Sequence, residues 1–429
     1  MKQSKYNTSI SIDAQKKMLF NTLHRNFIVY DNSKEENLFA LLENLDRKDF
    51  GEEETADLKK LIHKKMIIGD NVDEVELVKK HEKRVRENED IFQLVILPTL
   101  DCNFRCPYCY EEHRKLKIDD ETANRIIKLV ENITPNIKSL HITWFGGEPL
   151  LEADRVISLS KKIIEICEKN NCTYAAMIVS NGYLLNDELI DIIPEIGITR
   201  AQITVDGEPE FHNKKRPLDT GAGTFDEILK NVNKLIDKGL RITLRSNMDE
   251  ENYDHIEGLY DFIPEDKRES VDVNICNLYQ TVDKKSTYKI YKAAIDKGYK
   301  FLLDRNRYFT CATCLKNGLT IGPTGRLLAC SQKTEETDEY FGHLGENGEP
   351  VIENRSFFDE VRNVSIQDNE ACKECIKMPM CTSACKFRLL ERKQSCIGKS
   401  LEWLEMEDFA KLQYFSDLSQ KLIKGADII

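Results

Sequence analysis

Short apolar runs alternate with amphipathic stretches through the middle of the chain. The apolar runs are rich in β-branched residues and are bounded by polar segments, which predicts β-strands. The predicted strands cover residues 92–97, 140–145, 174–179, 200–205, 241–246 and 270–276. Between these runs, apolar residues recur at helical spacing. The predicted helices cover residues 120–132, 153–169, 186–193, 225–238 and 252–262.

Strands that alternate with helices predict βα units and a parallel sheet, which places the chain in the α/β class. Six such strands fit a complete or partial (β/α)6 barrel. In sheets of this kind, ligand sites lie at the carboxyl ends of the strands. We therefore expect the loops that follow the strands to carry the chemistry.

The first part of the chain has a different pattern. The stretch KKMLFNTLHRNFIVYD predicts two strands, around Met18–Phe20 and Phe27–Tyr30, joined by a polar turn. Ser33 and Glu36 have the spacing of a capping box that opens a helix through Leu45. Two further helices are expected. They cover residues 56–65 and 72–88. A strand hairpin followed by three helices predicts a winged-helix-like module over residues 1–90.

The alternation of strands and helices stops near residue 305. The stretch LTIGPTGRLLAC predicts a hairpin with its turn at Gly322–Gly325, and the chain closes with a predicted helix over residues 401–423. These changes predict three domains. Their expected bounds are residues 1–90, 91–305 and 306–429.

Composition excludes several classes of protein. The formal net charge of −12 argues against a general nucleic-acid binder, whose phosphate contacts require a basic surface. The chain has no run of about 18 apolar residues, so we expect no membrane span. Its first residues lack the apolar core of a signal peptide, which predicts a cytoplasmic protein.

The fourteen cysteines are unevenly distributed. Three lie near residue 105 and eight lie between residues 311 and 396. A reducing compartment would not preserve a disulfide framework. Clustered thiols therefore favour metal or iron–sulfur ligation.

Cys102, Cys106 and Cys109 directly follow the first predicted strand of the barrel. Three thiolates do not complete a four-coordinate site by themselves. Zinc would need a fourth ligand, for which His113 is near in sequence. A [4Fe–4S] cluster on three cysteines leaves one iron open to a substrate or cofactor. A set of redox thiols is a further alternative.

The stretch CNFRCPYCY resembles the CxxxCxxC signature of the radical S-adenosylmethionine (SAM) superfamily, and its place after the first strand matches too. The resemblance implies a cluster whose open iron binds SAM. It also implies reductive cleavage of SAM to a 5′-deoxyadenosyl radical, which abstracts hydrogen from an unactivated carbon. Tyr108, before the third cysteine, then packs beside the cofactor.

Three further motifs carry the same resemblance. WFGGEPLL follows the second strand and is similar to the GGEP motif, whose backbone binds the ammonium group of SAM. SNGYLL follows the third strand and supplies ribose ligands by resemblance. TVDGEPEFHNKKRP follows the fourth strand and resembles a stretch in which a basic residue neutralises the SAM carboxylate; it departs from that pattern at Thr204, Val205 and 213–215. The resemblance implies these cofactor-binding residues: Gly146, Gly147, Glu148, Ser180, Asn181, Thr204, Asp206 and Arg216, with Lys215 as the alternative cation.

The second cysteine set resembles the SPASM domain of a radical SAM subgroup. Cys314 and Cys330 frame Gly325, and five more cysteines follow at matching spacing. With Cys311, eight thiols suffice for two fully ligated auxiliary [4Fe–4S] clusters. The family pattern implies that the first cluster takes Cys311, Cys314, Cys330 and Cys385. It implies that the second takes Cys372, Cys375, Cys381 and Cys396. Of the other cysteines, Cys167 and Cys276 are expected in the core, and Cys172 is expected to have no role.

The resemblance implies a maturase of ribosomally synthesised peptides that forms a thioether or a carbon–carbon crosslink. The N-terminal module resembles domains that capture a leader peptide as an added strand. Expected partners are a precursor peptide and a flavodoxin or ferredoxin reductant. One alternative is an anaerobic sulfatase-maturating enzyme that oxidises Cys or Ser to formylglycine, for which Asp206 and Asp272 are candidate bases. A non-catalytic carrier of three clusters is another.

Overall fold

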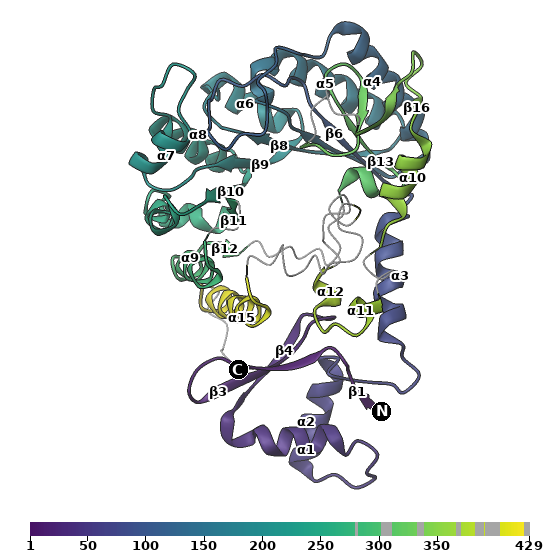
Figure 1. The fold of residues 1–429 in the computed structure, drawn as a ribbon, viewed down its shortest axis with the longest axis vertical. Helices are drawn as coiled ribbons and strands as arrows, with labels where there is room; N and C mark the ends of the chain where they lie inside the picture. The colour runs from purple at the N-terminus through teal and green to yellow at the C-terminus, as the bar shows by residue number, and fades with distance from the viewer. Residues whose placement is uncertain are drawn as a thin grey trace. The chain divides into compact units, whose positions relative to one another are not determined.

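The computed structural model describes residues 1–278, 282–301, 311–332, 339–365, 370–381, 390 and 404–423. The chain divides into two compact units. The N-terminal unit contains residues 1–85 and the described residues of 364–414. The sheet unit contains residues 86–301 and the described residues of 310–363 and 415–423 (Figure 1).

The sheet unit is built on six parallel strands that confirm the six predicted ones. Buried and partly exposed residues alternate along β6, as expected for a strand with two unlike faces. Each of these strands pairs in parallel with the next along the chain. The strands are β6 Ile91–Ile96, β7 Ser139–Trp144, β8 Thr173–Ser180, β9 Ile198–Thr204, β10 Arg241–Met248 and β11 Val271–Asn277.

The sheet continues beyond these six strands at both edges. Its full order is β12-β11-β10-β9-β8-β7-β6-β13-β14-β15-β16. β13 lies parallel to β6, and the three strands after it are antiparallel. The predicted hairpin at Gly322–Gly325 is confirmed as β13 and β14. The added strands are β12 Lys300–Phe301, β13 Gly318–Ile321, β14 Arg326–Leu328, β15 Tyr340–Leu344 and β16 Pro350–Ile352.

Helices cover one face of this sheet (Figure 1). Four of the five predicted helices are confirmed, because their apolar stripes pack on the strands that they connect. The predicted helix over residues 252–262 is wrong: the chain forms two short 3-10 turns there. The helices are α4 Asp120–Ile133, α5 Ala153–Lys169, α6 Asp187–Glu195, α7 Pro209–Lys215, α8 Phe225–Asp237, α9 Lys284–Asp296 and α10 Arg355–Asn363. The 3-10 turns are η2 Thr134–Asn136, η3 Pro149–Glu152, η4 Tyr253–His255, η5 Glu257–Asp261, η6 Glu265–Ser270 and η8 Ala312–Cys314.

The N-terminal unit contains a three-stranded antiparallel sheet of order β2-β3-β4 and a two-stranded pair of β1 and β5. The predicted hairpin and three helices are confirmed, but the capping box is wrong: α1 begins without a side-chain cap, directly after the turn η1. The strands are β1 Lys2–Gln3, β2 Asn7–Ser11, β3 Lys16–Asn21, β4 Asn26–Asp31 and β5 Ile67–Ile68. The helical elements are η1 Asn32–Lys34, α1 Glu35–Glu43, α2 Glu52–His63, α3 Glu74–Arg86, α11 Glu370–Lys373 and α12 Met378–Cys381.

Apolar side chains from distant parts of the chain form the core of this unit. Met18 and Phe20 of β3 pack with Ala410 of α15 (Met406–Ile423). Leu19 faces the opposite way and packs with Leu41 and Leu61 of the helices. The alternation along β3 therefore buries both faces of the small sheet. Within the described residues, no helix is long and apolar enough to cross a membrane.

Candidate functional site

The loop that carries Cys102, Cys106 and Cys109 follows β6 at the carboxyl edge of the parallel sheet. The amide of Cys109 donates to the carbonyl of Cys106 at 3.0 Å, which closes a tight turn between the last two cysteines. The start of the loop is fixed from outside. Arg105 N donates to Pro217 O at 3.0 Å, and Phe104 forms a bridge with Leu218. The segment after α7 therefore holds the cysteine loop in place.

The two glycines after β7 lie against the backbone that leads into this loop. A Cβ atom on Gly146 would stand 2.3 Å from the carbonyl oxygen of Thr99, and one on Gly147 would stand 2.2 Å from that of Asp101. Gly146 also has a φ of 116°, in the region that favours glycine. Gly147 N donates to Thr99 O at 3.1 Å. The absence of a side chain at these two glycines thus lets the segment after β7 lie directly against the backbone that leads into the cysteine loop.

Glu148 joins the loops that follow β7 and β8. Its carboxylate is fully buried and accepts hydrogen bonds from Ser180 Oγ at 2.8 Å and from Asn181 N at 2.6 Å. Burial raises the pKa of Glu148, and these hydrogen bonds oppose that rise. Asn181 Nδ2 in turn donates to Asn103 Oδ1 at 2.8 Å. Glu148 and Ser180 thus use their polar atoms to connect three loops. Their predicted contacts with SAM stay predictions.

Tyr108 is the centre of a buried polar network. Its hydroxyl donates to the carboxylate of Asp206, which lies just after β9. The same oxygen accepts from Arg216 Nη1 at 2.7 Å and from Asn247 Nδ2 at 3.2 Å. Asn247 N donates to Asp206 Oδ1 at 2.7 Å. The network therefore ties the cysteine loop to the ends of β9 and β10 and to the segment after α7.

A buried cation stands close to the three thiols. Burial raises the pKa of Cys102 to about 12 and also raises the pKa values of Cys106 and Cys109. The charge of Arg216 opposes the rise for all three thiols. Burial lowers the pKa of Arg216, but its interactions with Tyr108, Cys106 and Asp206 outweigh burial and raise that pKa, so the guanidinium stays charged. A buried positive charge beside three thiols favours their anionic, metal-binding form.

His212 of α7 supports this network through hydrogen bonds of both its ring nitrogens. Its Nδ1 accepts from Asp206 N at 3.1 Å, and its Nε2 lies 3.0 Å from Thr224 Oγ1. Because Thr224 Oγ1 donates to Arg216 O at 2.8 Å, the Nε2 proton points to Thr224. Burial and the charge of Arg216 lower the pKa of His212 well below its ordinary value. The imidazole is therefore neutral and fixes the turn that presents Asp206.

Other predicted side chains lie elsewhere. Lys215 is paired with Asp249 and makes no contact with the network in the described residues. Asp272 lies at the amino end of β11 and pairs with Arg241 at 2.8 Å, so it is at the edge of the sheet away from the cysteines. Thr204 is buried at the carboxyl end of β9. Asn247 was missed, although the rule that sites follow parallel strands points to its place on β10.

Several buried polar atoms beside the thiols have no partner in the described part of the chain: Asn103 Nδ2, Glu111 Oε2, His113 Nδ1 and Arg216 Nε. Burial raises the pKa of Glu111 to about 7. Unpaired buried donors and acceptors are costly, and they mark places where a bound group supplies the missing partner. Three thiols with such neighbours fit an iron–sulfur cluster and a polar cofactor. Among the described residues, no group of three His, Cys, Asp or Glu side chains is arranged to hold a single metal ion.

The described auxiliary cysteines fall into two groups. Cys311, Cys314 and Cys330 belong to the sheet unit, where Cys314 N donates to Cys311 O at 2.8 Å. Their neighbour Gly318 starts β13 against the carbonyl of Ala312. This group therefore lies beside the added strand of the sheet.

Cys372, Cys375 and Cys381 belong to the N-terminal unit. They are partly buried and pack against Tyr6, Leu23, Val78 and Met378. The hydroxyl of Tyr6 is buried without a partner in the described residues. Three thiols that pack against one cluster, with an unpaired donor in that cluster, supply residue types that an iron–sulfur centre uses. Cys385 and Cys396, the predicted fourth ligands, lie outside the described residues.

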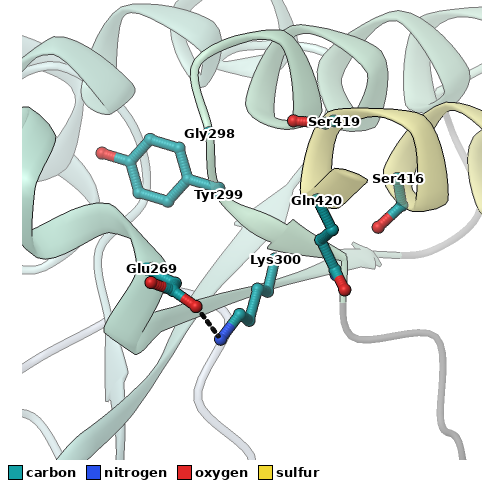
Figure 2. Close-up of a pocket in the computed structure, with 7 residues that line it drawn as sticks. All are labelled: Glu269, Gly298, Tyr299, Lys300, Ser416, Ser419 and Gln420. Atoms are coloured by element: carbon teal, nitrogen blue, oxygen red, sulfur yellow. Dashed lines mark hydrogen bonds and ion pairs between the residues drawn. The ribbon is translucent and has the colours of Figure 1, made fainter. Parts of the chain in front are cut away.

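The remaining cysteines and a small pocket lie away from these groups. Cys167 and Cys172 are buried, which confirms the core position predicted for Cys167; Cys276 is partly exposed. The pocket lies between the β12 edge and one side of α15 (Figure 2), where Lys300 pairs with Glu269 at 3.3 Å. Its lining contains serines and an amide but no thiol. We therefore do not assign it to the site.

Comparison with known proteins identifies the domain that holds the three-cysteine loop. Residues 96–263 match the model of the Radical SAM superfamily. This part of the chain is a radical SAM domain.

Curated relatives extend the likeness beyond this domain. The chain is homologous to the radical SAM cyclopropyl synthase TigE of Paramaledivibacter caminithermalis, with 21% identity over 89% of each chain. Two other relatives match over shorter stretches. The Fe-coproporphyrin III synthase of Methanosarcina barkeri is 25% identical over 39% of this chain, and the serine-type anaerobic sulfatase-maturating enzyme of Bacteroides thetaiotaomicron is 28% identical over 38%. The chain spans only 40% and 41% of the lengths of these two relatives.

Two solved structures share the fold. The enzyme anSMEcpe with bound AdoMet matches with a TM-score of 0.55 and 17% identity, over 77% of this chain and 100% of that one. SuiB of Streptococcus suis bound to precursor peptide SuiA matches with a TM-score of 0.52 and 15% identity, over 92% of this chain and 97% of that one. The chain thus has an α/β radical SAM fold with a partial, barrel-like parallel sheet.

Proposed function

We propose that this chain, whose residues 96–263 form a radical SAM domain, is a maturase of a ribosomally synthesised peptide. It would form a thioether or a carbon–carbon crosslink in the core part of a precursor peptide. One observation carries the proposal: the likeness to TigE runs through 89% of the chain and so includes regions on both sides of the radical SAM domain. The likeness to the sulfatase-maturating enzyme covers 38%.

The bond type follows from chemistry. The relative with the long match is a cyclopropyl synthase by name. A cyclopropyl ring is closed by a carbon–carbon bond, so of the two products this likeness favours the carbon–carbon bond. SuiB, which matches over 92% of the chain, was solved with its precursor peptide. The likeness to SuiB supports a peptide substrate.

The chain's own residues would perform three tasks at the site. Cys102, Cys106 and Cys109 would hold a [4Fe–4S] cluster, and Arg216 would offset its negative charge. The glycines and Glu148 would keep the loops after β6, β7 and β8 in register around SAM. When bound, the cluster and SAM would supply a 5′-deoxyadenosyl radical that abstracts hydrogen from a residue of the core peptide.

Two auxiliary [4Fe–4S] clusters belong to the proposal, because seven further cysteines follow the SPASM spacing and Cys311 adds an eighth thiol. A flavodoxin or ferredoxin in the cytoplasm would supply electrons. The winged-helix-like region within residues 1–90 would bind the leader of the precursor as an added strand. The described edge strands of its sheet are β2 and β4.

The test is a turnover assay on peptides with and without a leader. The chain is reconstituted with iron and sulfide without oxygen, reduced with dithionite and given SAM and the precursor peptides encoded beside its gene. Mass spectrometry should show loss of two hydrogen atoms, one from each of the two atoms joined, in the core part of the full precursor. The same core without its leader should be modified at least tenfold more slowly. Equal rates for both would remove the leader-binding role.

The second candidate is an anaerobic sulfatase-maturating enzyme, which the match to the enzyme of Bacteroides thetaiotaomicron favours. The same assay with a sulfatase-derived peptide separates the two candidates. Formylglycine in that peptide, with the precursors unchanged, would assign the chain to sulfatase maturation. SAM left intact by a fully loaded chain would favour a non-catalytic cluster carrier.

A further inference from the structure

Residues from the first 85 positions of the chain pack against the segment that contains Cys372, Cys375 and Cys381. These cysteines pack against an apolar cluster in which Tyr6 and Leu23 come from the start of the chain. The cluster also includes Val78 of α3 and Met378 of α12. The segment therefore packs against Tyr6, Leu23 and Val78, which are some 300 to 370 positions away in sequence.

Polar contacts fix the backbone between these cysteines to the same elements. Thr22 Oγ1 donates to Ile376 O at 2.5 Å, and Lys5 Nζ donates to Lys373 O at 2.8 Å. Thr22 and Lys5 are the immediate neighbours of Leu23 and Tyr6. The carbonyl groups that they bind lie between the first and third cysteines of the segment. Apolar packing and hydrogen bonds thus hold the cysteine segment against the cluster that contains Tyr6.

The hydroxyl of Tyr6 lacks a partner in this arrangement. Tyr6 is 0% exposed, and its oxygen forms no hydrogen bond within the described part of the chain. The backbone at Tyr6 is fixed, because its carbonyl accepts from Thr22 N at 2.9 Å. Burial is the main cause of the raised pKa of Tyr6, and the charges of Glu74, Glu374, Asp73 and Cys375 add to it in that order.

An unpaired buried hydroxyl destabilises the folded protein and marks a place where a bound group can supply the missing partner. A phenol is a hydrogen-bond donor at neutral pH. The sulfur atoms of an iron–sulfur cluster and of its thiolates accept such bonds, and donors to sulfur set the reduction potential of the cluster. Tyr6 belongs to the cluster on which the three cysteines pack, and its hydroxyl is unpaired in the described residues, which matches this role.

We propose that Tyr6 donates a hydrogen bond to a sulfur atom of the iron–sulfur cluster held by Cys372, Cys375 and Cys381. The inference rests on the proposed function, which assigns a cluster to these thiols. The N-terminal region then has two roles: it binds the leader, and it forms part of the protein shell of an auxiliary cluster. A hydrogen bond to sulfur stabilises the reduced, more negatively charged cluster and raises its potential.

The test is a redox titration of the full, reconstituted chain followed by electron paramagnetic resonance. The signal of this cluster is identified as the one that disappears in Cys375→Ala. Tyr6→Phe should keep the iron content and shift the midpoint of this signal to lower potential. Tyr30→Phe is the matched control, because its hydroxyl lies 2.8 Å from Ser9 Oγ in the same unit and faces no cysteine in the described residues. It should leave the midpoint unchanged.

A second measurement separates a role toward the cluster from a structural role. In the iron-free chain, Tyr6→Phe removes an unpaired polar atom and should be at least as stable as the wild type. In the loaded chain it should be less stable. An equal loss of stability in both states would overturn the inference.

The outcomes also separate this inference from the proposed function. If the wild type and Cys375→Ala bound equal iron, no cluster would be held by these thiols, and this would contradict both the role of Tyr6 and the part of the proposed function that assigns a cluster here. Iron lost in Cys375→Ala, with an unchanged or raised midpoint in Tyr6→Phe, would overturn the role of Tyr6 alone.

Discussion

Tyr108 combines two functions that the sequence shows only in part. Its place before the third cysteine indicates an aromatic ring near the cofactor. Its hydroxyl also donates a hydrogen bond to Asp206 and accepts hydrogen bonds from Arg216 and Asn247, which lie in three separate segments. The resemblance names Asp206 and Arg216 as separate cofactor ligands. The structure instead brings them together around one phenol, which only the three-dimensional arrangement of the strands reveals.

Removing this hydroxyl should destabilise the chain. Tyr108→Phe keeps the ring but leaves Asp206, Arg216 and Asn247 with an unmet hydrogen bond. We expect the free energy of unfolding to fall by about 1–3 kcal/mol. Chemical denaturation measures it. Tyr183→Phe is the control, since its ring contacts Phe104 but no hydrogen bond of its hydroxyl is seen in the described residues. An equal effect of both variants would contradict the network.

His212 should make stability depend on pH. Its folded pKa lies well below its ordinary value of 6.5. Its contribution is therefore complete above pH 6.5 and is lost as the pH falls toward the folded pKa, at about 1.4 kcal/mol per pH unit. Unfolding measured at pH 7.5 and 5.5 should show this loss in the wild type and a smaller one in His212→Gln. Equal losses would show that His212 is not held neutral.

At the scale of elements, periodicity identified the sheet well. Six strands were predictable because each is bounded by polar loops and carries a continuous apolar run. The added strands β13–β16 were only partly predictable, since they are three to five residues long and the first of them, β13, pairs with β6, which is distant in sequence. The helix expected over residues 252–262 failed for a related reason. Asn252 Nδ2 donates to Asp206 O and Asn247 O, and this tertiary contact outweighs local propensity.

Gly147, in the loop after β7, lies so close to the cysteine loop that adding one methyl group there should have a measurable effect. In Gly147→Ala, the Cβ would stand 2.2 Å from Asp101 O, so the cysteine loop must move. We expect a loss of about 3 kcal/mol or more in unfolding free energy and less iron bound at the loop. Gly239→Ala is the control, with positive φ but no atom within 4 Å. It should cost about 1–2 kcal/mol and keep its iron.

At the scale of the whole molecule, cysteine spacing indicates a single C-terminal domain, whereas the contacts divide it. Cys311, Cys314 and Cys330 group with the sheet, and Cys372, Cys375 and Cys381 group with the first 85 residues. No local pattern encodes this division, because it depends on pairing across hundreds of residues. The predicted domain bounds 1–90, 91–305 and 306–429 stay predictions. The two compact units are defined by which residues contact each other.

Iron content tests how the cysteines are shared among sites. A chain with three [4Fe–4S] clusters binds about twelve irons. Replacing Cys102, Cys106 and Cys109 by alanine should remove about four, and replacing Cys372, Cys375 and Cys381 should remove a different four. Iron and sulfide analysis of the reconstituted variants measures both losses. A wild type that binds about eight irons or fewer when saturated would contradict three clusters.

The central claim is that the loop after β6 directs the cleavage of SAM. The most direct measurement is the yield of 5′-deoxyadenosine after the reconstituted chain is reduced in the presence of SAM, compared with Cys106→Ala. We predict multiple turnovers for the wild type and none for the variant, with the auxiliary iron retained in both. A wild type that holds all its iron and leaves SAM intact would contradict the claim.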